Sequence, residues 1–568
     1  MILKALYDYY NRRGDLPPVG FELKEIGFLI VIDKEGNFRR LESRMENNKT
    51  AKKFLVLRTV QRSSTKFVPN YLWDKYDYVI GGSDKNNKKR QTFIDMVDSL
   101  RTQLKQNEYL EAISGFYKKN NDVENALRND TLFDSLCKSN KNISFLIQGY
   151  RRIAAEDEDI TRTILSQKAE EHYGVCLITG NKGPIARMHS GIKLGQNTGP
   201  LVSLQSDKGY DSYGKEQGLN ASVTEEAEFK YWAALQSMLS DGSRNKFQVG
   251  NRYFLFWASS NSEAAEKAEA GLFDLLVISE YKEDNPDANI LMVRQVFDAI
   301  VKGDLRTELD DRFYILGLTP NKTRRAVVYW SETSLKDFAS MILRHFDDMA
   351  IEPHKGARPY MGVWSMVSAV TLGGKPSDAT PNLPESIVKS IFQGYPYPFT
   401  LFSSCIRRIR AESGEKNSVY AVRAAIIKAY LNRLNDNNKK IQTMLDKDYT
   451  NSGYLCGRLF AVLDKIQEEA SNISSIRERY MNAASATPSA VFATILNLSV
   501  HHAEKLGAGR KVQFEKLKQE ILAKLPADGF PAHLNLQDQG RFFVGYYHQR
   551  QDFFTKNEES NEQINVEQ

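Results

Sequence analysis

A run of basic side chains without any opposing carboxylate lies in the first hundred residues. Between Glu46 and Asp74 the chain has no acidic residue. Phosphate binding needs cations of this kind, and its free energy comes largely from the release of counterions. Small polar side chains beside such cations can contact sugars or base edges. The segment therefore offers candidate contacts to a nucleic acid: Lys53, Arg62 and Lys66 for phosphates, and Asn70 for a base edge.

The same segment also fits a purely structural interpretation. Its cations could line the solvated face of a strand, and the aromatic residues that follow could belong to the core. For Trp73 and Tyr78 we expect burial in the core in either case. Asn70 follows Pro69, so its side chain could cap a turn instead of reaching a base. The composition leaves both interpretations open.

A second segment, residues 206–221 (SDKGYDSYGKEQGLNA), is rich in glycine and follows no strong periodicity. Glycine lets a backbone approach a ligand closely and expose its N–H groups. Neither the P-loop spacing nor the dinucleotide-binding fingerprint is present, so nucleotide hydrolysis is disfavoured. A surface loop braced by its own side chains is an equally good interpretation. As nucleic-acid contacts, the candidates in this loop are Lys208, Gly214, Lys215, Gln217 and Asn220.

Residues typical of catalytic or metal sites are scattered rather than clustered. The eight histidines form no HxxxH or HExxH pattern, and the four cysteines form no CxxC pair. A GxSxG nucleophile elbow is absent. His548 stands in GYYHQR, where we expect it to be packed among tyrosines and hydrogen-bonded in a helix bundle. The sequence therefore predicts a protein that is not an enzyme, with no catalytic residue, no metal site and no cofactor.

Cysteine usage and hydropathy indicate where the protein works. Isolated cysteines are typically small buried hydrophobes, and their wide spacing here suits a reducing compartment. No run of about 18 apolar residues occurs, so a membrane span is not expected. We therefore expect a cytoplasmic protein that makes no contact with a membrane.

The first hundred residues are predicted to be rich in strands. Residues 27–43 (GFLIVIDKEGNFRRLES) have the pattern of a hairpin with its turn at residues 33–36. KFLVLRTV and DYVIGG indicate two further strands, and the spacing of apolar residues predicts helical structure over residues 92–126. Further on, acidic residues after Thr224 indicate a helix start. Residues 311–348 have a strand–turn–strand–helix pattern.

From about Leu383 onward the pattern is helical almost throughout. The predicted fold class is α+β, with a β-rich mixed N-terminal region with helical insertions, followed by an all-α C-terminal helical bundle. The predicted domains are an α+β domain that binds the nucleic acid (1–345), a helical connecting region (346–443) and a C-terminal helical domain (444–568). The last of these holds 14 basic and 16 acidic side chains, against 63 and 55 in the rest of the chain. A polyanion should therefore dock on the N-terminal part.

Several stretches, in order along nearly the whole chain, resemble the type I-C CRISPR large-subunit family (Csd-type). The most specific is SYGKEQGLNASVTEEAEFKY, residues 212–231, together with PIARMHSGIK. PNYLWDKYDYVIG, residues 69–81, is similar to a family hallmark of the form N-[FY]-L-W-[DE]. Lys75 departs from the family pattern, which often has Asn at this position. The resemblance is completed by MILKALYDYY, QGYPYP, RRIRAE, YLCGRLFAVL, ASATPSAVF and the terminal GYYHQR.

The resemblance implies membership of an RNA-guided interference complex, Cascade, in which base pairing between guide and target reads the sequence. The large subunit would recognise the PAM, a short duplex motif beside the target, and promote duplex opening and R-loop formation in antiviral defence. The implied partners are target double-stranded DNA, the guide RNA ribonucleoprotein with its backbone and 5′-handle-binding subunits, a small subunit from the same gene, and the helicase-nuclease that the chain helps to recruit. In this family the small subunit arises by internal initiation, and Met444 is the best internal start here.

In this interpretation the basic segment enters a groove of the PAM duplex, and Asn70→Ala should change PAM preference by about 1–3 kcal/mol. Lys208, Lys215 and Gln217 would grip phosphate or wedge the first opened base pair. Two other classes of protein remain open on the sequence. One is a stand-alone nucleic-acid-processing enzyme, and the other is an assembly scaffold without DNA contact.

Overall fold

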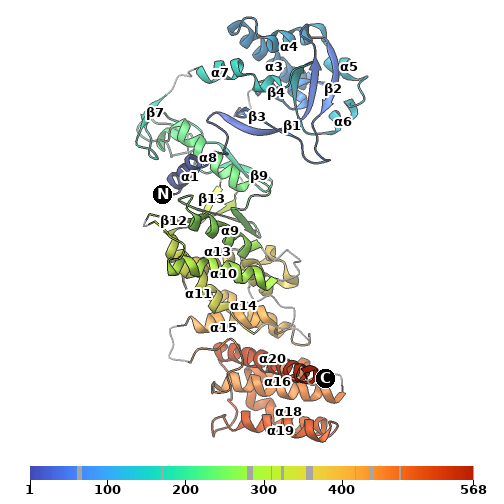
Figure 1. Cartoon of the computed structure of the whole chain (residues 1–568), viewed down its shortest axis with the longest axis vertical. Helices are drawn as coiled ribbons and strands as arrows, with labels where there is room; N and C mark the ends of the chain where they lie inside the picture. The colour runs from blue at the N-terminus through green and yellow to red at the C-terminus, as the bar shows by residue number, and fades with distance from the viewer. Residues whose placement is uncertain are drawn as a thin grey trace. The chain divides into compact units, whose positions relative to one another are not determined.

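The computed structural model describes the chain except for residues 61–66, 83, 168–171, 207, 278–285, 309, 322–324, 353–361, 416–417, 435–438, 472–474 and 567–568. The described residues form two compact units (Figure 1). The N-terminal unit comprises residues 1–237, and the C-terminal unit comprises residues 238–321 and 325–568. The domain boundaries predicted at residues 345 and 443 both fall inside the C-terminal unit, and whether they delimit separate parts stays a prediction.

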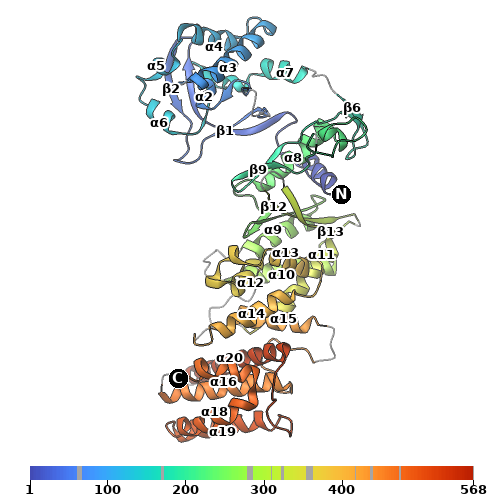
Figure 2. The same cartoon turned by 180° about the vertical axis from the view of Figure 1, so that it is seen from behind.

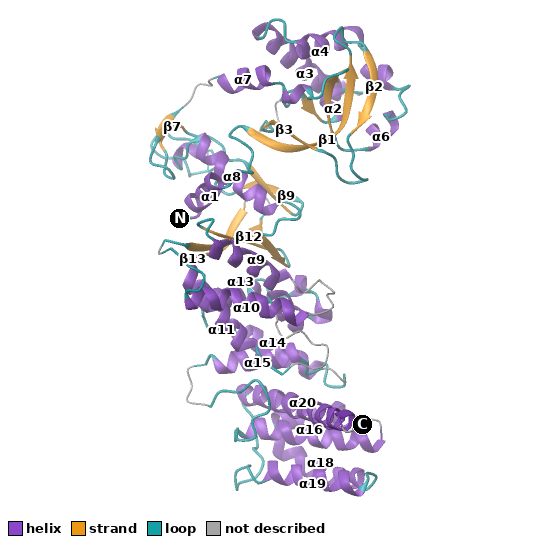
Figure 3. Ribbon diagram, in the orientation of Figure 1, coloured by secondary structure: helices purple, strands orange, loops and turns teal. Residues whose placement is uncertain are grey.

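Strand β1 (Phe21–Ile32) organises the main sheet of the N-terminal unit (Figure 3). The strand order is β2-β1-β5-β4, and β3 pairs with the first half of β1. Strand β1 runs antiparallel to β2 and β3 but parallel to β5, which follows more than a hundred residues later. The other strands are β2 (Phe38–Ser43), β3 (Lys53–Leu57), β4 (Trp73–Asp74) and β5 (Asn142–Ile147).

The predicted hairpin is confirmed, since β1 and β2 are joined by a turn at residues 33–36. Gly36 in this turn has a φ of +82°, and a Cβ there would lie 2.4 Å from the backbone nitrogen of Phe116. The turn therefore packs against a helix only because it carries glycine. Helices cover the sheet and bury the second half of β1 completely. They are α2 (Tyr76–Val79), α3 (Asp84–Gln103), α4 (Glu108–Lys119), α5 (Val123–Leu127), α6 (Phe133–Lys138) and α7 (Glu158–Ser166).

One local prediction in this region was wrong. DYVIGG is not a strand: it forms α2, whose end is followed by Gly81 and Gly82 with φ of +94° and +103°. The strand lies just before it, at β4, and is only two residues long. The helical structure predicted over residues 92–126 is confirmed, and it is divided among the three helices α3, α4 and α5. Asn107 caps the second one by accepting a hydrogen bond from the backbone of Leu110 at 3.1 Å.

The remainder of the N-terminal unit is built around helix α8 (Glu225–Leu239), which begins after Thr224 as predicted. Helix α1 (Ile2–Arg12) packs on α8. The rings of Tyr10 and Phe229 meet edge to face, with their centres 6.0 Å apart. Two small antiparallel hairpins precede α8 in the chain. They are β6 (Tyr173–Val175) with β7 (Lys182–Pro184), and β8 (Gly191–Leu194) with β9 (Asn197–Pro200).

The C-terminal unit begins with a four-stranded antiparallel sheet in the order β10-β11-β12-β13. Its buried face carries stacked aromatic rings: the ring centres of Phe313 and of Phe338, in the helix that follows the sheet, lie 4.0 Å apart. The strands are β10 (Lys246–Val249), β11 (Arg252–Ala258), β12 (Arg312–Pro320) and β13 (Arg325–Ser334). The helices that follow or interrupt them are α9 (Glu263–Val277), α10 (Pro286–Lys302) and α11 (Leu335–Met349).

After Ser334 the regular elements of the described residues are all helical, which confirms the predicted fold class (Figure 2). One hydrophobic core runs without interruption from the sheet of this unit into its last helices. The helices are α12 (Val363–Val370), α13 (Leu383–Phe392), α14 (Phe399–Ala411), α15 (Ala421–Asn432), α16 (Ser452–Ser471), α17 (Ser475–Ala486), α18 (Pro488–Ala503), α19 (Ala508–Leu522) and α20 (Leu536–Val566).

Helices α16 and α20 approach each other closely through glycines. A Cβ on Gly457 would lie 1.9 Å from the carbonyl oxygen of Phe542. His548 of α20 is fully buried, and its Nδ1 lies 2.9 Å from the hydroxyl of Tyr454. The predicted packing of this histidine among tyrosines is therefore confirmed.

Burial of the cysteines was predicted correctly for three of the four. Cys137, near the end of helix α6, is exposed. Trp73 and Tyr78 lie in the core, with exposed fractions of 1% and 5%. None of the helices among the described residues is long and apolar enough to cross a membrane.

Candidate nucleic-acid interface

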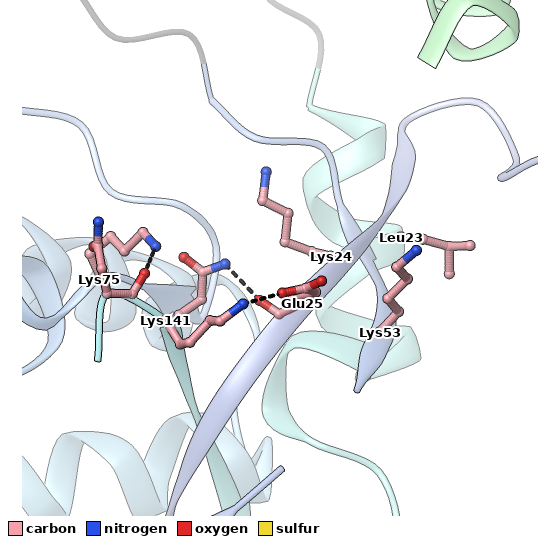
Figure 4. Close-up of a pocket in the computed structure, with 8 residues that line it drawn as sticks. Leu23, Lys24, Glu25, Lys53, Lys75 and Lys141 are labelled. Carbon is pink, nitrogen blue, oxygen red and sulfur yellow. Dashed lines mark hydrogen bonds and ion pairs between the residues drawn. The ribbon is translucent and has the colours of Figure 1, made fainter. Parts of the chain in front are cut away.

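The N-terminal unit carries a pocket of about 570 Å³ whose lining includes four lysines (Figure 4). We call this pocket the lysine groove. It is lined by Leu23, Lys24, Glu25, Lys53, Lys75, Asn140, Lys141 and Asn142.

Strand pairing brings these lysines together from four separate segments. In the β1–β3 ladder Glu25 stands opposite Lys53, so Lys24 and Lys53 lie on adjacent strands. The parallel β1–β5 pairing places Ile26 opposite Asn142, which brings Lys141 to the same end of the sheet. Lys75 follows β4, which pairs with β5. The convergence thus depends on long-range pairing.

The groove carries an excess of positive charge. Of the eight lining residues only Glu25 is acidic, and its carboxylate accepts a hydrogen bond from Lys141 at 2.5 Å. Burial, with the nearby charges of Lys24 and Lys141, lowers the pKa of Lys75. Burial is the larger cause because it disfavours the charged form, and repulsion from the ammonium groups of Lys24 and Lys141 adds to it. An anion in the groove would relieve this repulsion.

Hydrogen bonds hold several of the side chains that line the groove in place. Lys75 donates from Nζ to the carbonyl oxygen of Asn140, and the side-chain amide of Asn142 donates to the carbonyl oxygen of Glu25 at 2.7 Å. Lys24 donates to the hydroxyl of Thr59 at 3.0 Å and lies 5.3 Å from the centre of the Trp73 ring. The ammonium groups are therefore presented by a rigid sheet.

Of the candidate residues predicted from the sequence, Lys53 lies in the groove with an exposed side chain. Lys24, Lys75 and Lys141 were missed. Lys24 stands between two glutamates in the sequence, and Lys141 lies far outside the acid-free segment, so a search for unopposed local charge passes over both. Arg62 and Lys66 lie outside the described residues.

Asn70 is buried, with an exposed fraction of 3%. Its Oδ1 accepts a hydrogen bond from the backbone of Val60 at 3.0 Å, and its own backbone N–H donates to Asp74 at 2.8 Å. Asn70 thus joins the two ends of the segment that contains Arg62 and Lys66. This geometry matches the structural interpretation, and contact with a base edge stays a prediction that would require Asn70 to leave its present partners.

The glycine-rich loop, residues 206–221, is braced mainly by its own side chains. The Asn220 amide donates to the carbonyl oxygens of Lys215 at 2.9 Å and Gln217 at 3.2 Å. The Gln217 side chain accepts from Nε of Arg187 at 2.9 Å. Both amides that were predicted to pair with bases therefore hold the loop in shape. Gly214 has a φ of +70°, which the turn requires.

The structure brings the basic segment and the glycine-rich loop to one place. Arg58, at the end of β3, and Gln217 both line a pocket of about 600 Å³. Gln217 also lines a second pocket of about 460 Å³, together with Lys208 and the buried His189. Lys53, in contrast, lines neither of these two pockets.

Within the described part of the chain, no group of three or more His, Cys, Asp or Glu residues is placed to hold a metal ion. Among these pockets the lysine groove carries a clear excess of positive charge on an α+β scaffold, which suits binding of a polyanion.

Comparison with known families assigns the chain to a class and then to a family. It is a CRISPR-associated protein, since a model of such proteins matches residues 6–554, almost the whole chain. More narrowly, it belongs to the family described as CRISPR-associated protein (Cas_Csd1). No curated protein was found to match the chain.

Proposed function

We propose that this chain is the large subunit of a type I-C Cascade complex, and that it binds target DNA without catalysing a reaction. Membership of the Cas_Csd1 family supports a role in a CRISPR complex. The observation that carries the DNA-binding part is the lysine groove, whose lining holds four lysines and one glutamate, with Lys141 paired to Glu25 and Lys24 to Glu22 outside the lining. Clusters in which cations outnumber carboxylates are typical of proteins that bind phosphate backbones.

In the proposed mechanism, pairing between guide RNA and target reads the sequence, and this subunit recognises the PAM and promotes R-loop formation. The lysine groove holds the phosphate backbone of the PAM duplex. Phosphate contacts orient a protein on DNA but do not read bases. We therefore propose that the basic segment enters a groove of the PAM duplex to read it, with Arg62 and Lys66 as its predicted phosphate contacts and Asn70 as its predicted base contact.

The helical part of the C-terminal unit is proposed to hold the displaced strand and to help recruit the helicase-nuclease. We also propose that translation starts internally at Met444 to give a small subunit, and that both proteins work in the cytoplasm. Met444 has an exposed fraction of 58% and lies in the connector before α16, so translation from this point would begin with whole helices.

The proposal is tested by purifying the tagged chain from cells that carry the complete CRISPR locus. We expect guide RNA, companion subunits and a C-terminal fragment beginning at Met444 to copurify. Complexes assembled with and without the chain are then compared on DNA targets that differ only in the PAM. Equal PAM discrimination without the chain would support a scaffold without DNA contact, and metal-dependent DNA turnover by the chain alone would support an enzyme.

A further inference from the structure

The glycine-rich loop carries a tyrosine that is almost completely exposed to solvent. The exposed fraction of Tyr213 is 99%. Aromatic rings ordinarily contribute large buried areas to cores and interfaces, so a ring held fully in water is a candidate for contact with a ligand.

The backbone at this tyrosine is held in an unfavourable conformation. Tyr213 has a φ of +50° and Gly214 a φ of +70°, and the backbone N–H of Lys215 donates to the carbonyl oxygen of Ser212 at 2.9 Å. Left-handed backbone at both central residues is typical of type I′ turns, which favour Asn or Gly. A tyrosine is therefore strained at this position.

Side chains from within the loop fix the turn from behind. The Oδ1 of Asn220 accepts hydrogen bonds from the backbone and hydroxyl of Ser212, at 3.3 Å and 3.1 Å. Asp211 accepts from the backbone of Gln217 at 3.1 Å. Because both flanks of the turn are tied down, the ring of Tyr213 is presented on a rigid support. Such preorganisation lowers the entropy lost on binding.

Charges around the ring favour a nucleic acid as the ligand. Glu216 is paired with Arg187 at 2.7 Å, and Asp211 is engaged by loop amides. No ion pair within the described residues involves the ammonium groups of Lys208 and Lys215, which are exposed on the same loop. An exposed aromatic ring on a loop that also carries available cations is a combination with which proteins stack and hold single-stranded bases.

Resting on the proposed function, we propose that Tyr213 stacks on an unpaired DNA base at the junction between duplex and single strand. The loop would thereby favour the opened form of the DNA over the closed duplex, since only the opened form offers a free base face.

Two substitutions separate the ring from the backbone strain. Tyr213→Phe keeps the ring, whereas Tyr213→Asn removes it and is better suited to the left-handed conformation. The probe is a forked DNA duplex with 2-aminopurine at the first unpaired position, bound by the full-length chain. We expect the wild type and Tyr213→Phe to quench the fluorescence. Tyr213→Asn should lose the quenching and bind the fork roughly 5- to 100-fold more weakly, with unchanged binding of fully paired duplex.

Quenching by Tyr213→Asn equal to that of the wild type would overturn the inference and leave the proposed function standing. Loss of copurifying subunits in Tyr213→Asn, with fork binding intact, would also overturn it, because the ring would then contact a protein. A wild-type chain that binds neither forked nor paired DNA would instead contradict the proposed function itself.

Discussion

Arg58 and Glu228 form an ion pair that ties the end of strand β3 to helix α8. Their side chains meet at 3.0 Å and 3.3 Å, and Glu228 also accepts a hydrogen bond from the backbone of Ser190 at 2.7 Å. The guanidinium of Arg58 lies 4.4 Å from the centre of the Trp232 ring. Since Arg58 shares a pocket with Gln217, this pair holds the basic segment beside the glycine-rich loop.

Replacing the buried partner of this pair should destabilise the protein. Glu228 has an exposed fraction of 3%, so Glu228→Ala leaves Arg58 and the Ser190 amide without their acceptor. We expect a loss of about 3 kcal/mol in the free energy of unfolding, measured by denaturant titration. The matched control is Glu226→Ala, two residues away in the same helix, which removes a solvent-exposed carboxylate paired with Lys230. That change should cost less than about 0.5 kcal/mol, and equal losses would contradict the prediction.

The lysine groove should govern the salt dependence of DNA binding. Lys53→Ala and Lys75→Ala should each weaken binding to all duplexes alike and reduce the slope of log K against log salt by about 0.9. Lys52→Ala is the control, because Lys52 neighbours Lys53 and is exposed but does not line the groove. Binding is measured by fluorescence anisotropy at several salt concentrations. If the salt slopes of the two groove variants equal that of the wild type, the groove does not contact DNA.

Asn70 should act on DNA binding through the backbone rather than through base contact. Asn70→Ala removes the acceptor for the Val60 amide, at a cost of about 1 kcal/mol in stability. We therefore expect its DNA affinity to fall equally for every PAM. Asn70→Asp keeps an oxygen at the same position and should retain more of the affinity. A selective loss for one PAM would instead support the base-edge contact predicted from the sequence.

His548 should make stability depend on pH on the acid side. Burial lowers the pKa of His548 to about 3, whereas an unfolded histidine has a pKa near 6.5. Between these values the unfolded state binds more protons, so stability is lost as the pH falls below 6.5. At pH 5 the loss amounts to about 2 kcal/mol.

The variant His548→Gln should lack this component of the pH dependence. We expect the difference in unfolding free energy between pH 7 and pH 5 to be smaller in the variant than in the wild type. Urea titrations at both pH values measure it, and the comparison cancels the carboxylates common to both proteins. If the unfolding free energy changes equally with pH in the wild type and the variant, His548 is protonated in the folded protein as readily as in the unfolded one.

The contact between α16 and α20 should not tolerate a side chain at Gly457. The Cβ in Gly457→Ala would overlap the carbonyl oxygen of Phe542, so the helices must separate, at a cost of about 3 kcal/mol. Gly509→Ala in α19 is the control, since a Cβ there meets no atom within 4 Å. It should stabilise the helix by about 0.5–1 kcal/mol. Thermal unfolding distinguishes the two, and similar midpoints would contradict the packing argument.

Local patterns in the sequence predicted the elements that local physics decides. The hairpin turn ending at Gly36, the helix start after Thr224 and the burial of Trp73 and His548 follow from turn chemistry, capping and hydrophobicity. DYVIGG was predicted to be a strand because its apolar β-branched residues favour strands. In the structure the chain forms only the short helix α2 before Gly81 and Gly82, both of which have a positive φ.

By itself, the sequence determined the α+β class, the helical C-terminal part, the family and the position of one groove residue, Lys53. The tertiary structure alone decided that Lys24, Lys75 and Lys141 join it, and that Asn70 faces inward to Val60. Periodicity reports on neighbours a few residues apart. The charge that gathers in the groove instead depends on which strands pair across more than a hundred residues, and no local pattern encodes that choice.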